Sequence, residues 1–261
     1  MLKVPSRTRV NTSQPKIRLG VNIDHIATLR EVRKATYPSL LEALFICERA
    51  GADQITVHLR EDRRHIQDAD VSALLQHSHL PLNLEMAWVP EMVKKAAQWQ
   101  PHSVTLVPER REEMTTESGL DLNIIEKAKR NLGSLQKASK VYGFIEPNSK
   151  QVQLAKKLGL DGIEFHTGHF SHLWTAALRD KKKAAALNLE IDKLNQSAKL
   201  ARQIGLEVKA GHGLTTENVH ALMEMPGLEE VNIGHFIVAR AVIVGLHLAI
   251  VEMKQALNRA V

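Results

Sequence analysis

Histidine and glutamate side chains attract attention in this sequence because several fall in or just after short apolar runs. His58 ends the run QITVH, Glu85 lies in LNLEM, and His212 lies between two glycines in KAGHGL. Histidine can give and take protons at neutral pH, since its ordinary pKa is about 6.5. A glutamate withdrawn from water has a raised pKa and can serve as a general base. These residues therefore predict proton-transfer chemistry.

The glycines around His212 indicate a second property, the binding of an anion. Glycine lets the backbone approach a ligand closely, and a helix that starts just beyond it presents unpaired N–H groups. The stretch NIGH at residues 232–235 has the same character. Guanidinium groups could bind a second anion, and the ends of the first two runs are followed by Arg30, Arg33, Arg60, Arg63 and Arg64. Two anionic sites are expected, although Arg63 and Arg64 fit a solvated loop better.

A metal site is the main alternative use for thirteen histidines. His166 and His169 are three residues apart, and His58 and His65 are seven apart. However, the first run ends in Asp-His and not in a His-x-His pair, and the single cysteine, Cys47, excludes a cysteine pair. This spacing does not favour a catalytic metal, so we expect none.

Short apolar runs, most of them followed by a helical pattern, can position these residues. Eight runs are found, at residues 17–24, 54–59, 80–86, 102–108, 140–146, 162–168, 206–212 and 229–235. Eight strand–helix units in 261 residues are typical of a parallel (β/α)8 barrel, in which active sites form at the C-terminal strand ends. A doubly wound open sheet is the alternative, but the first two runs lack a G-x-G-x-x-G stretch.

The chain is therefore expected to fold as one α/β domain, a single (β/α)8 TIM barrel with extra helices, over residues 17–261. Residues 1–16 are polar and are expected to form a flexible extension. The segment 168–205 is longer than one barrel helix requires, which predicts an additional helix after the sixth strand.

Composition excludes several other classes of protein. The chain is 44% hydrophobic and 25% charged, which is ordinary for a globular protein. Its net charge of +6 is modest, and the aromatic content of 4% argues against a stacking platform for single-stranded nucleic acid. The most apolar stretch, residues 235–253, is interrupted by Arg240 and His247 and is too polar to cross a membrane. We expect a cytoplasmic protein with no nucleic-acid or membrane partner.

Several longer stretches resemble the pyridoxine 5'-phosphate synthase family. In chain order they are GVNIDHIATLR, AGADQITVHLREDRRHI, LNLEMA, LVPERREEMTTESGLD, IEFHTG, AGHGLT and NIGHFIVARAV. The resemblance extends from about Ile17 to Met253. It implies a barrel enzyme, a transferase of vitamin B6 biosynthesis, that forms homo-octamers and needs no metal or redox cofactor. Its two phosphorylated substrates would agree with the two expected anionic sites.

The resemblance also implies roles for individual residues. His58 and Glu85 resemble the family's catalytic bases, and His212 resembles its proton donor. Residues resembling those that hold 1-deoxy-D-xylulose 5-phosphate are Asp24, His25, Arg60, His65 and Thr115. Residues resembling those that hold 3-amino-2-oxopropyl phosphate are Asn22, Arg33, Gly213, Gly234 and His235. The implied products are pyridoxine 5'-phosphate, inorganic phosphate and water.

The sequence departs from the family at a few places, and two other functions remain open. Lys209 stands where the family usually has Asn, Glu146 stands where Asp is common, and residues 169–195 match poorly. A phosphosugar aldolase or isomerase would use a Schiff-base lysine, for which Lys209 is the candidate, or a divalent metal. A basic nucleic-acid-binding protein would need a one-sided Lys/Arg stripe. Residues 236–253 carry more apolar surface than one barrel helix needs, which predicts contact with another subunit.

Overall fold

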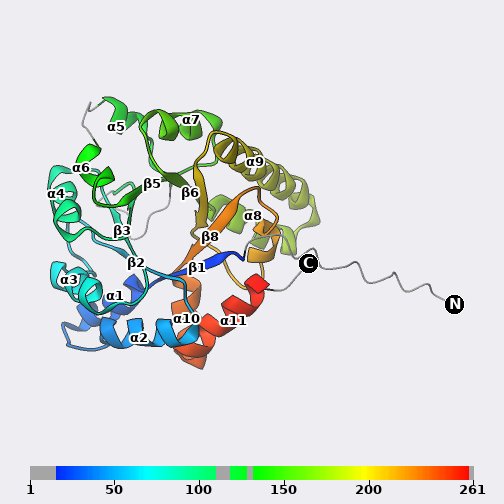
Figure 1. Cartoon of the computed structure of the whole chain (residues 1–261). Helices are drawn as coiled ribbons and strands as arrows, with labels where there is room; N and C mark the ends of the chain where they lie inside the picture. Colours follow the sequence, from blue (N-terminus) through cyan, green and yellow to red (C-terminus); the bar gives the residue numbers. More distant parts are fainter. Residues whose placement is uncertain (1–15, 110–117, 128–131, 259–261) are drawn as a thin grey trace.

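The structure is a computed structural model that describes residues 16–109, 118–127 and 132–258. Within these residues, eight parallel strands form a closed barrel in which β8 pairs with β1 (Figure 1). The strands are β1 (Arg18–Asn22), β2 (Gln54–His58), β3 (Leu82–Met86), β4 (Ser103–Leu106), β5 (Lys140–Ile145), β6 (Gly162–His166), β7 (Glu207–Gly211) and β8 (Leu228–Ile233). The predicted barrel is confirmed. The extension expected over residues 1–16 lies outside the described residues except for Lys16.

Alternation of side chains along each strand explains why these segments become barrel strands. In β2, Ile55 and Val57 are buried in the hydrophobic core shared with the surrounding helices. Gln54 and Thr56 point the other way, because their side chains hydrogen bond to Asn232 of β8, which is not a neighbour of β2 in the barrel. The period of two thus separates an apolar outer face from an inner face that ends at His58.

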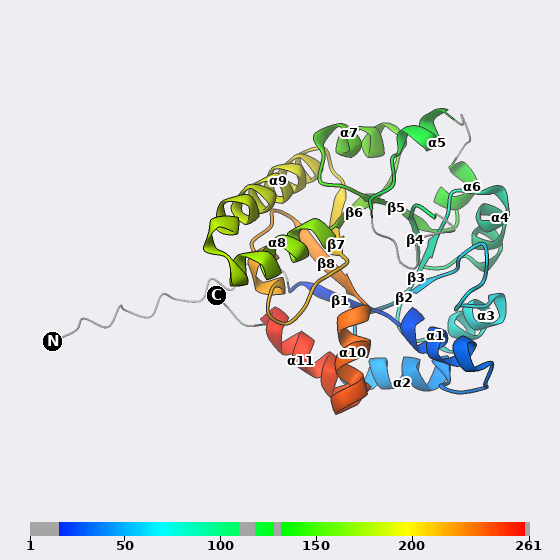
Figure 2. The ribbon, with the colours of Figure 1, turned by 180° about the vertical axis from the view of Figure 1, so that it is seen from behind.

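Helices surround the barrel on its outside (Figures 1 and 2). Local signals set several of their ends, as in α2, where Ser39 Oγ accepts a hydrogen bond from Glu42 N and Gly51 closes the helix with φ 82°. The α-helices are α1 (Asp24–Arg33), α2 (Leu40–Ala50), α3 (Asp68–His77), α4 (Pro90–Trp99), α5 (Asn123–Lys127), α6 (Gly133–Gln136), α7 (Ser149–Lys157), α8 (Gly168–Arg179), α9 (Ala184–Gln203), α10 (His235–Val244) and α11 (Leu246–Asn258). Two 3-10 helices are η1 (Lys181–Lys183) and η2 (Val219–Leu222).

Three helices begin within two residues of the end of a strand and precede a second helix of the same unit. They are α1 after β1, α8 after β6 and α10 after β8. The expected extra helix after the sixth strand is therefore confirmed as α8. Its first residue, Gly168, and the first residues of the other two, Asp24 and His235, all lie at the C-terminal rim of the barrel, which we call the mouth. Two of these helices, α1 and α10, thus bring a polar side chain to the mouth.

The described helices include none that combines the length and the apolar character needed to span a membrane. The apolar stretch at residues 235–253 is divided between α10 and α11 at Gly245, whose φ is 85°. The expectation that this stretch is not a spanning helix agrees with this division.

The inside of the barrel is filled mainly by polar side chains, whereas such barrels more often contain branched apolar residues. Lys209 Nζ lies 2.8 Å from Glu230 Oε1, and each side chain is only 2% exposed. Gln54 also donates to Glu230, at 2.8 Å. Gly20 leaves room for this network, since a Cβ there would lie 1.9 Å from Asn232 Oδ1. The network continues to Glu164, which accepts a hydrogen bond from Asn232 Nδ2 at 2.7 Å.

Candidate active site

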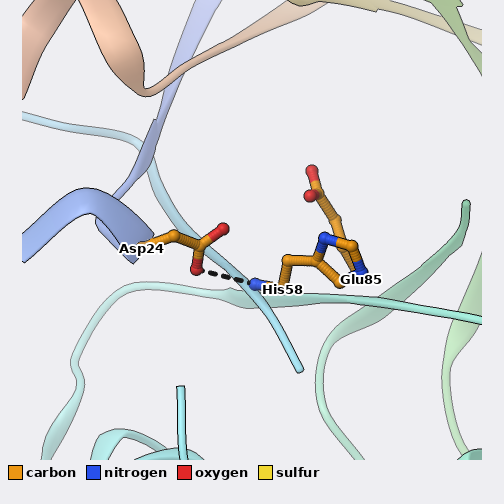
Figure 3. A group of neighbouring side chains, drawn as sticks. All are labelled: Asp24, His58 and Glu85. Carbon is orange, nitrogen blue, oxygen red and sulfur yellow. Dashed lines mark hydrogen bonds between the residues drawn. The ribbon is translucent and has the colours of Figure 1, made fainter. Parts of the chain in front are cut away.

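The first two predicted bases lie together at the mouth. His58 ends β2, and Glu85 is opposite it in the register of β3. Asp24, the first residue of α1, completes the group: one side-chain oxygen or ring nitrogen of each residue lies within 4.8 Å of the others. Figure 3 shows the three side chains, which come from β2, β3 and the start of α1. Because each belongs to a rigid element, their spacing is fixed by the barrel.

Asp24 is a buried carboxylate that holds the main chain of His58. Its Oδ1 accepts from His58 N at 2.8 Å, and its Oδ2 accepts from Asn22 Nδ2 at 2.9 Å. Burial raises the pKa of Asp24 to about 6, although the nearby His58 and these hydrogen bonds favour its charged form. Asp24 therefore both fixes the end of β2 and titrates close to neutral pH.

The His58 imidazole is held by a residue that the sequence analysis did not select. His58 Nε2 lies 3.0 Å from Glu109 Oε1, and both side chains are 6% exposed. The second oxygen of Glu109 accepts from Glu61 N at 3.0 Å. Burial raises the pKa of Glu109, but its bonds with His58 and Glu61 outweigh this effect and leave the pKa below its usual value. Glu109 directly follows the fourth predicted strand. This position at a strand end was the only feature of the sequence that could have marked Glu109 as a site residue.

Glu85 and Glu164 are carboxyl groups with raised pKa values. The pKa of Glu85 lies well above its usual value because of burial and the charges of Glu164 and Asp24. Burial also raises the pKa of Glu164 to about 7, partly offset by Lys209 and by the 2.7 Å hydrogen bond from Asn232 Nδ2. Glu85 is partly exposed while Glu164 is 1% exposed. Glu85 is thus the one with access to a ligand, and its raised pKa suits a general base.

His212 sits in a turn of unusual backbone conformation. Its φ is 76° and that of Gly213 is 77°, a region that only glycine occupies without cost. The turn is held from α8 and the residue before it: Thr167 Oγ1 donates to the carbonyl of His212 at 2.6 Å, and Ser171 Oγ donates to that of Gly213 at 2.7 Å. Such strain persists where surrounding contacts enforce it, and it concentrates at functional sites.

The surroundings of His212 keep its imidazole neutral. Burial and the nearby His166, His172 and His235 lower the pKa of His212 to about 4. The ring centroids of His166 and His212 are 4.8 Å apart, and His166 Nδ1 lies 2.8 Å from Glu146 Oε1. Gly168 permits this close, tilted ring contact, since a Cβ there would lie 2.6 Å from His166 Nε2. Glu146, a departure from the family pattern, therefore acts as the carboxylate partner of His166.

Several predicted substrate contacts surround these groups. His25 and His235 have ring centroids 5.4 Å apart. Gly234 lies against Asn22, whose Cβ would be 3.0 Å from a Cβ added to the glycine. The ring of His65 is 6.0 Å from that of His58, and burial with the charges of His58 and Arg60 lowers the pKa of His65 to about 3. The structure thus gathers these histidines at the mouth, where burial also lowers the pKa of His25.

The arginines divide into two groups. Arg30 is paired with Asp70, Arg63 with Asp68 and Glu91, and Arg64 with Asp62. These ion pairs give the three residues structural roles. This agrees with the interpretation of Arg63 and Arg64 as loop residues, and it leaves fewer arginines available for the expected second anionic site.

For two arginines of the expected cluster, Arg60 and Arg33, the binding role stays a prediction. Arg60 is 3% exposed, two residues after His58 in sequence, and its Nε lies 3.6 Å from Asp62 Oδ1. Arg33 is exposed at the end of α1. Thr115, also a predicted substrate contact, falls outside the described residues.

A metal ion would find three potential ligands in Asp24, His58 and Glu85, a number common in catalytic zinc sites. However, both oxygens of Asp24 already accept hydrogen bonds, and His58 Nε2 is directed at Glu109. The oxygens of Asp24 and the Nε2 of His58 therefore already have hydrogen-bond partners, and the arrangement suits proton transfer better than metal binding.

A hollow of about 490 Å³ lies elsewhere, on the outer surface beside α4, lined by residues that include Trp88, Pro90 and Val93. Its lining contains no histidine or carboxylate. The mouth, where the acid and base groups converge, is the better candidate for catalysis.

Solved structures with low sequence identity show the same fold. A tryptophan synthase from M. tuberculosis matches with a TM-score of 0.59 at 10% identity, over 93% of this chain and 93% of that chain. A thiamine phosphate pyrophosphorylase from Pyrococcus furiosus matches with a TM-score of 0.54 at 12% identity, over 92% of this chain and 95% of that chain. At such identities the likeness extends to the barrel fold alone.

Similarity at the level of sequence is much closer to one family. A pyridoxine 5'-phosphate synthase from Synechococcus sp. is 49% identical over 92% of this chain and 98% of its own length. The enzyme of the same name from Hydrogenobaculum sp. is 48% identical over 91% of this chain and 98% of its own length. The family described as pyridoxal phosphate biosynthesis protein PdxJ matches residues 19–259. The chain that carries this mouth of paired imidazoles and carboxylates therefore belongs to the PdxJ family.

Proposed function

We propose that this protein is a pyridoxine 5'-phosphate synthase that joins 1-deoxy-D-xylulose 5-phosphate to 3-amino-2-oxopropyl phosphate. The observation that carries the proposal is the convergence of His58 and Glu85 at the same rim as the strained His212 turn. The identities of 46–49% to enzymes of that name support it.

The proposed reaction consists of proton transfers coupled to losses of water and phosphate. The amine of one substrate attacks the ketone of the other, and loss of water gives an imine. Removal of a carbon-bound proton gives an enamine, from which phosphate leaves. Water then adds, an aldol-type attack closes the ring, and a final dehydration makes it aromatic. The partly exposed Glu85 and the buried His58 are the proposed bases for these steps.

His212 is the proposed proton donor, and its low pKa defines how it could act. With a pKa of about 4, its imidazole is neutral in the free protein at pH 7. A phosphate group bound beside it at the Gly213 and Gly234 turns would favour the imidazolium and raise the pKa. Substrate binding would therefore supply the donor form only when it is needed.

The Schiff-base form of the aldolase alternative depended on Lys209, and the structure disfavours this form. Lys209 Nζ is paired with Glu230 at 2.8 Å and lies 4.0 Å from the centroid of the Tyr142 ring. Its side chain is 2% exposed, so a carbonyl substrate could not reach the amine without opening the barrel interior. Lys209 thus has a structural role inside the barrel.

Self-association and a cytoplasmic location also belong to this proposal. Exposed apolar side chains gather on α1, α2, α10 and α11, which pack beside one another (Figures 1 and 2). We call the following set the apolar face: Leu29, Val32, Phe45, Val242, Ile243 and Leu248. It offers a surface for the proposed homo-octamer, whereas the cytoplasmic location rests on the phosphorylated substrates alone.

The direct test mixes the purified protein with both phosphorylated substrates, with and without a chelator, and follows pyridoxine 5'-phosphate by absorbance. The proposal predicts product and inorganic phosphate in equal amounts, at a rate that the chelator leaves unchanged. Product formation that stops with chelator and returns with a divalent metal would instead support the metal site at Asp24, His58 and Glu85.

A further inference from the structure

The His58 side chain is fixed through two different contacts. Asp24 holds its backbone N–H at 2.8 Å, and Glu109 meets its Nε2 at 3.0 Å. Glu109 is itself fixed, because its other oxygen accepts from Glu61 N. With its side chain 6% exposed, Glu109 has little access to water and serves the imidazole and that backbone amide.

This contact selects one tautomer of the imidazole. The pKa of Glu109 lies below its usual value, despite the burial that raises it, because of the bonds from His58 and Glu61. The carboxylate is therefore ionised at neutral pH, and an ionised carboxylate only accepts hydrogen bonds. A neutral His58 must then carry its proton on Nε2, which leaves the lone pair on Nδ1.

We propose that Glu109 is a positioning residue that holds the His58 proton on Nε2, so that Nδ1 is the atom that takes a proton from the substrate. This inference rests on the proposed function only for the identity of the substrate. In Figure 3 one ring nitrogen of His58 is on the side of the Asp24 and Glu85 carboxyl groups. The base and the second carboxyl therefore face a common space.

The other groups around His58 do not offer the same control. Asp24 accepts a hydrogen bond from the backbone N–H of His58 and not from its ring. The Nδ1 of His65 accepts a hydrogen bond from Ile66 N at 2.8 Å, and the ring centroids of His65 and His58 are 6.0 Å apart. Arg60 and Glu85 add charges of opposite sign nearby. Of the described residues, Glu109 is the one with a hydrogen bond to the ring.

The variant Glu109→Gln should reverse the tautomer. Glu61 N is a fixed donor, so the glutamine oxygen should face it and the glutamine NH2 should face His58 Nε2. That nitrogen must then accept, and the proton moves to Nδ1, the atom proposed to act as base. In a Ser-His-Asp protease, the equivalent change of the Asp to Asn lowers kcat about 10⁴-fold. We expect a kcat lower by roughly 10²- to 10⁴-fold, with KM changed little.

Glu109→Ala and Glu61→Gln separate this role from simple stabilisation of the loop. The alanine variant removes the partner but lets both tautomers form, so its kcat should exceed that of Glu109→Gln. Glu61 takes part only through its backbone, and its side chain is exposed, so Glu61→Gln should keep wild-type kcat. A glutamine variant as active as the alanine variant or more so would overturn the proposal.

Solid-state 15N spectra of histidine-labelled wild-type protein give a readout that does not depend on turnover or on folding of a variant. The proposal predicts a His58 resonance pair with a protonated Nε2 and a bare Nδ1, and the exchanged pair in Glu109→Gln. A wild-type protein with the proton on Nδ1 contradicts the role of Glu109 even if synthase activity is present. Absence of synthase activity with the predicted tautomer contradicts only the proposed function.

Discussion

At the scale of single residues, His212 joins a strained backbone to an acid–base side chain. Its φ of 76° is costly for a residue with a Cβ, but Asn tolerates this region better than other side chains. We predict that His212→Asn lowers kcat by roughly 10²- to 10⁴-fold, the range typical for general acid–base groups. The free energy of unfolding of the His212→Asn variant, measured in urea, should equal or exceed that of the wild type. A large loss of stability in His212→Asn would mean that contacts of the imidazole stabilise the turn. It would contradict the view that other contacts hold the turn and the turn positions the imidazole.

Glu164 gives the molecule a pH-dependent stability. Its pKa of about 7 in the folded protein is above the ordinary value of 4.5, mainly because of burial, so the folded state binds more protons between these values. Stability contributed by the protonated form is therefore lost as pH rises toward and beyond 7.

The variant Glu164→Gln removes this loss and keeps an acceptor for Asn232. We predict that the variant gains on the order of 1–3 kcal/mol relative to wild type on going from pH 5 to pH 8, at 1.36 kcal/mol per pKa unit. Urea unfolding at both pH values and one protein concentration measures it. The exposed Glu224→Gln serves as control and should show no such pH-dependent difference. An equal gain in both variants would exclude burial of Glu164 as the cause.

The residues of the site differ in how far the sequence could predict them. His58, Glu85 and His212 could be selected because each has a distinctive local setting in or just after a strand. Glu109 could not, because its contact with His58 joins positions 51 apart in sequence. The same holds for the pairing of Glu146 with His166, 20 residues apart. Side-chain pairs of this kind depend on strand register and on loop conformation, which periodicity does not reveal.

At the scale of elements, the ion pair between β7 and β8 is the most informative feature of the barrel interior. Lys209 and Glu230 are each 2% exposed, and Glu230 also contacts Gln54 and the half-exposed Arg18. Removing one partner of a buried pair usually costs about 3–5 kcal/mol, because the other charge stays buried.

For Lys209→Met we predict a loss of about 3 kcal/mol in the free energy of unfolding, at the low end because Arg18 and Gln54 still contact Glu230. The double variant Lys209→Met, Glu230→Gln should recover part of this loss. Borohydride with a carbonyl substrate should give no adduct on wild-type protein. If adding Glu230→Gln lowers the free energy of unfolding below that of Lys209→Met alone, the two charges do not compensate each other.

The eight strands were predictable because their side chains alternate or are continuously apolar, but their ends were not. The runs expected at 80–86 and 102–108 are observed as Leu82–Met86 and Ser103–Leu106. Pro81 and Pro108 explain part of the difference, since proline has no N–H to donate to a strand ladder. The helix expected after the sixth strand was predictable from chain length alone.

At the scale of the whole molecule, the apolar face is the feature that folding of one chain leaves unexplained. Val242 is 74% exposed and Ile243 is 77% exposed, both on α10. Large exposed apolar areas usually mark an interface. The prediction that residues 236–253 meet another subunit fits this observation, but the sequence could not indicate that α1 and α2 contribute to the same face.

We predict that Ile243→Glu lowers the molar mass of the protein in solution, as measured by light scattering on a size-exclusion column. A buried glutamate at a subunit contact would lack a partner and would weaken association. Leu178→Glu on α8 is the matched control, since Leu178 is 69% exposed but lies outside the apolar face. If Ile243→Glu keeps the wild-type mass while Leu178→Glu does not, the contact lies elsewhere.

The whole account depends on acid–base catalysis by groups that the barrel collects at its mouth, and Glu85→Gln tests this most directly. The substitution keeps the size of the side chain and removes the titratable carboxyl, whose raised pKa fits it as a base. The measurement is single-turnover formation of pyridoxine 5'-phosphate with saturating amounts of both phosphorylated substrates. We predict a rate lower by roughly 10²- to 10⁴-fold with substrate affinity nearly unchanged. A variant that forms product at the wild-type rate would contradict the account.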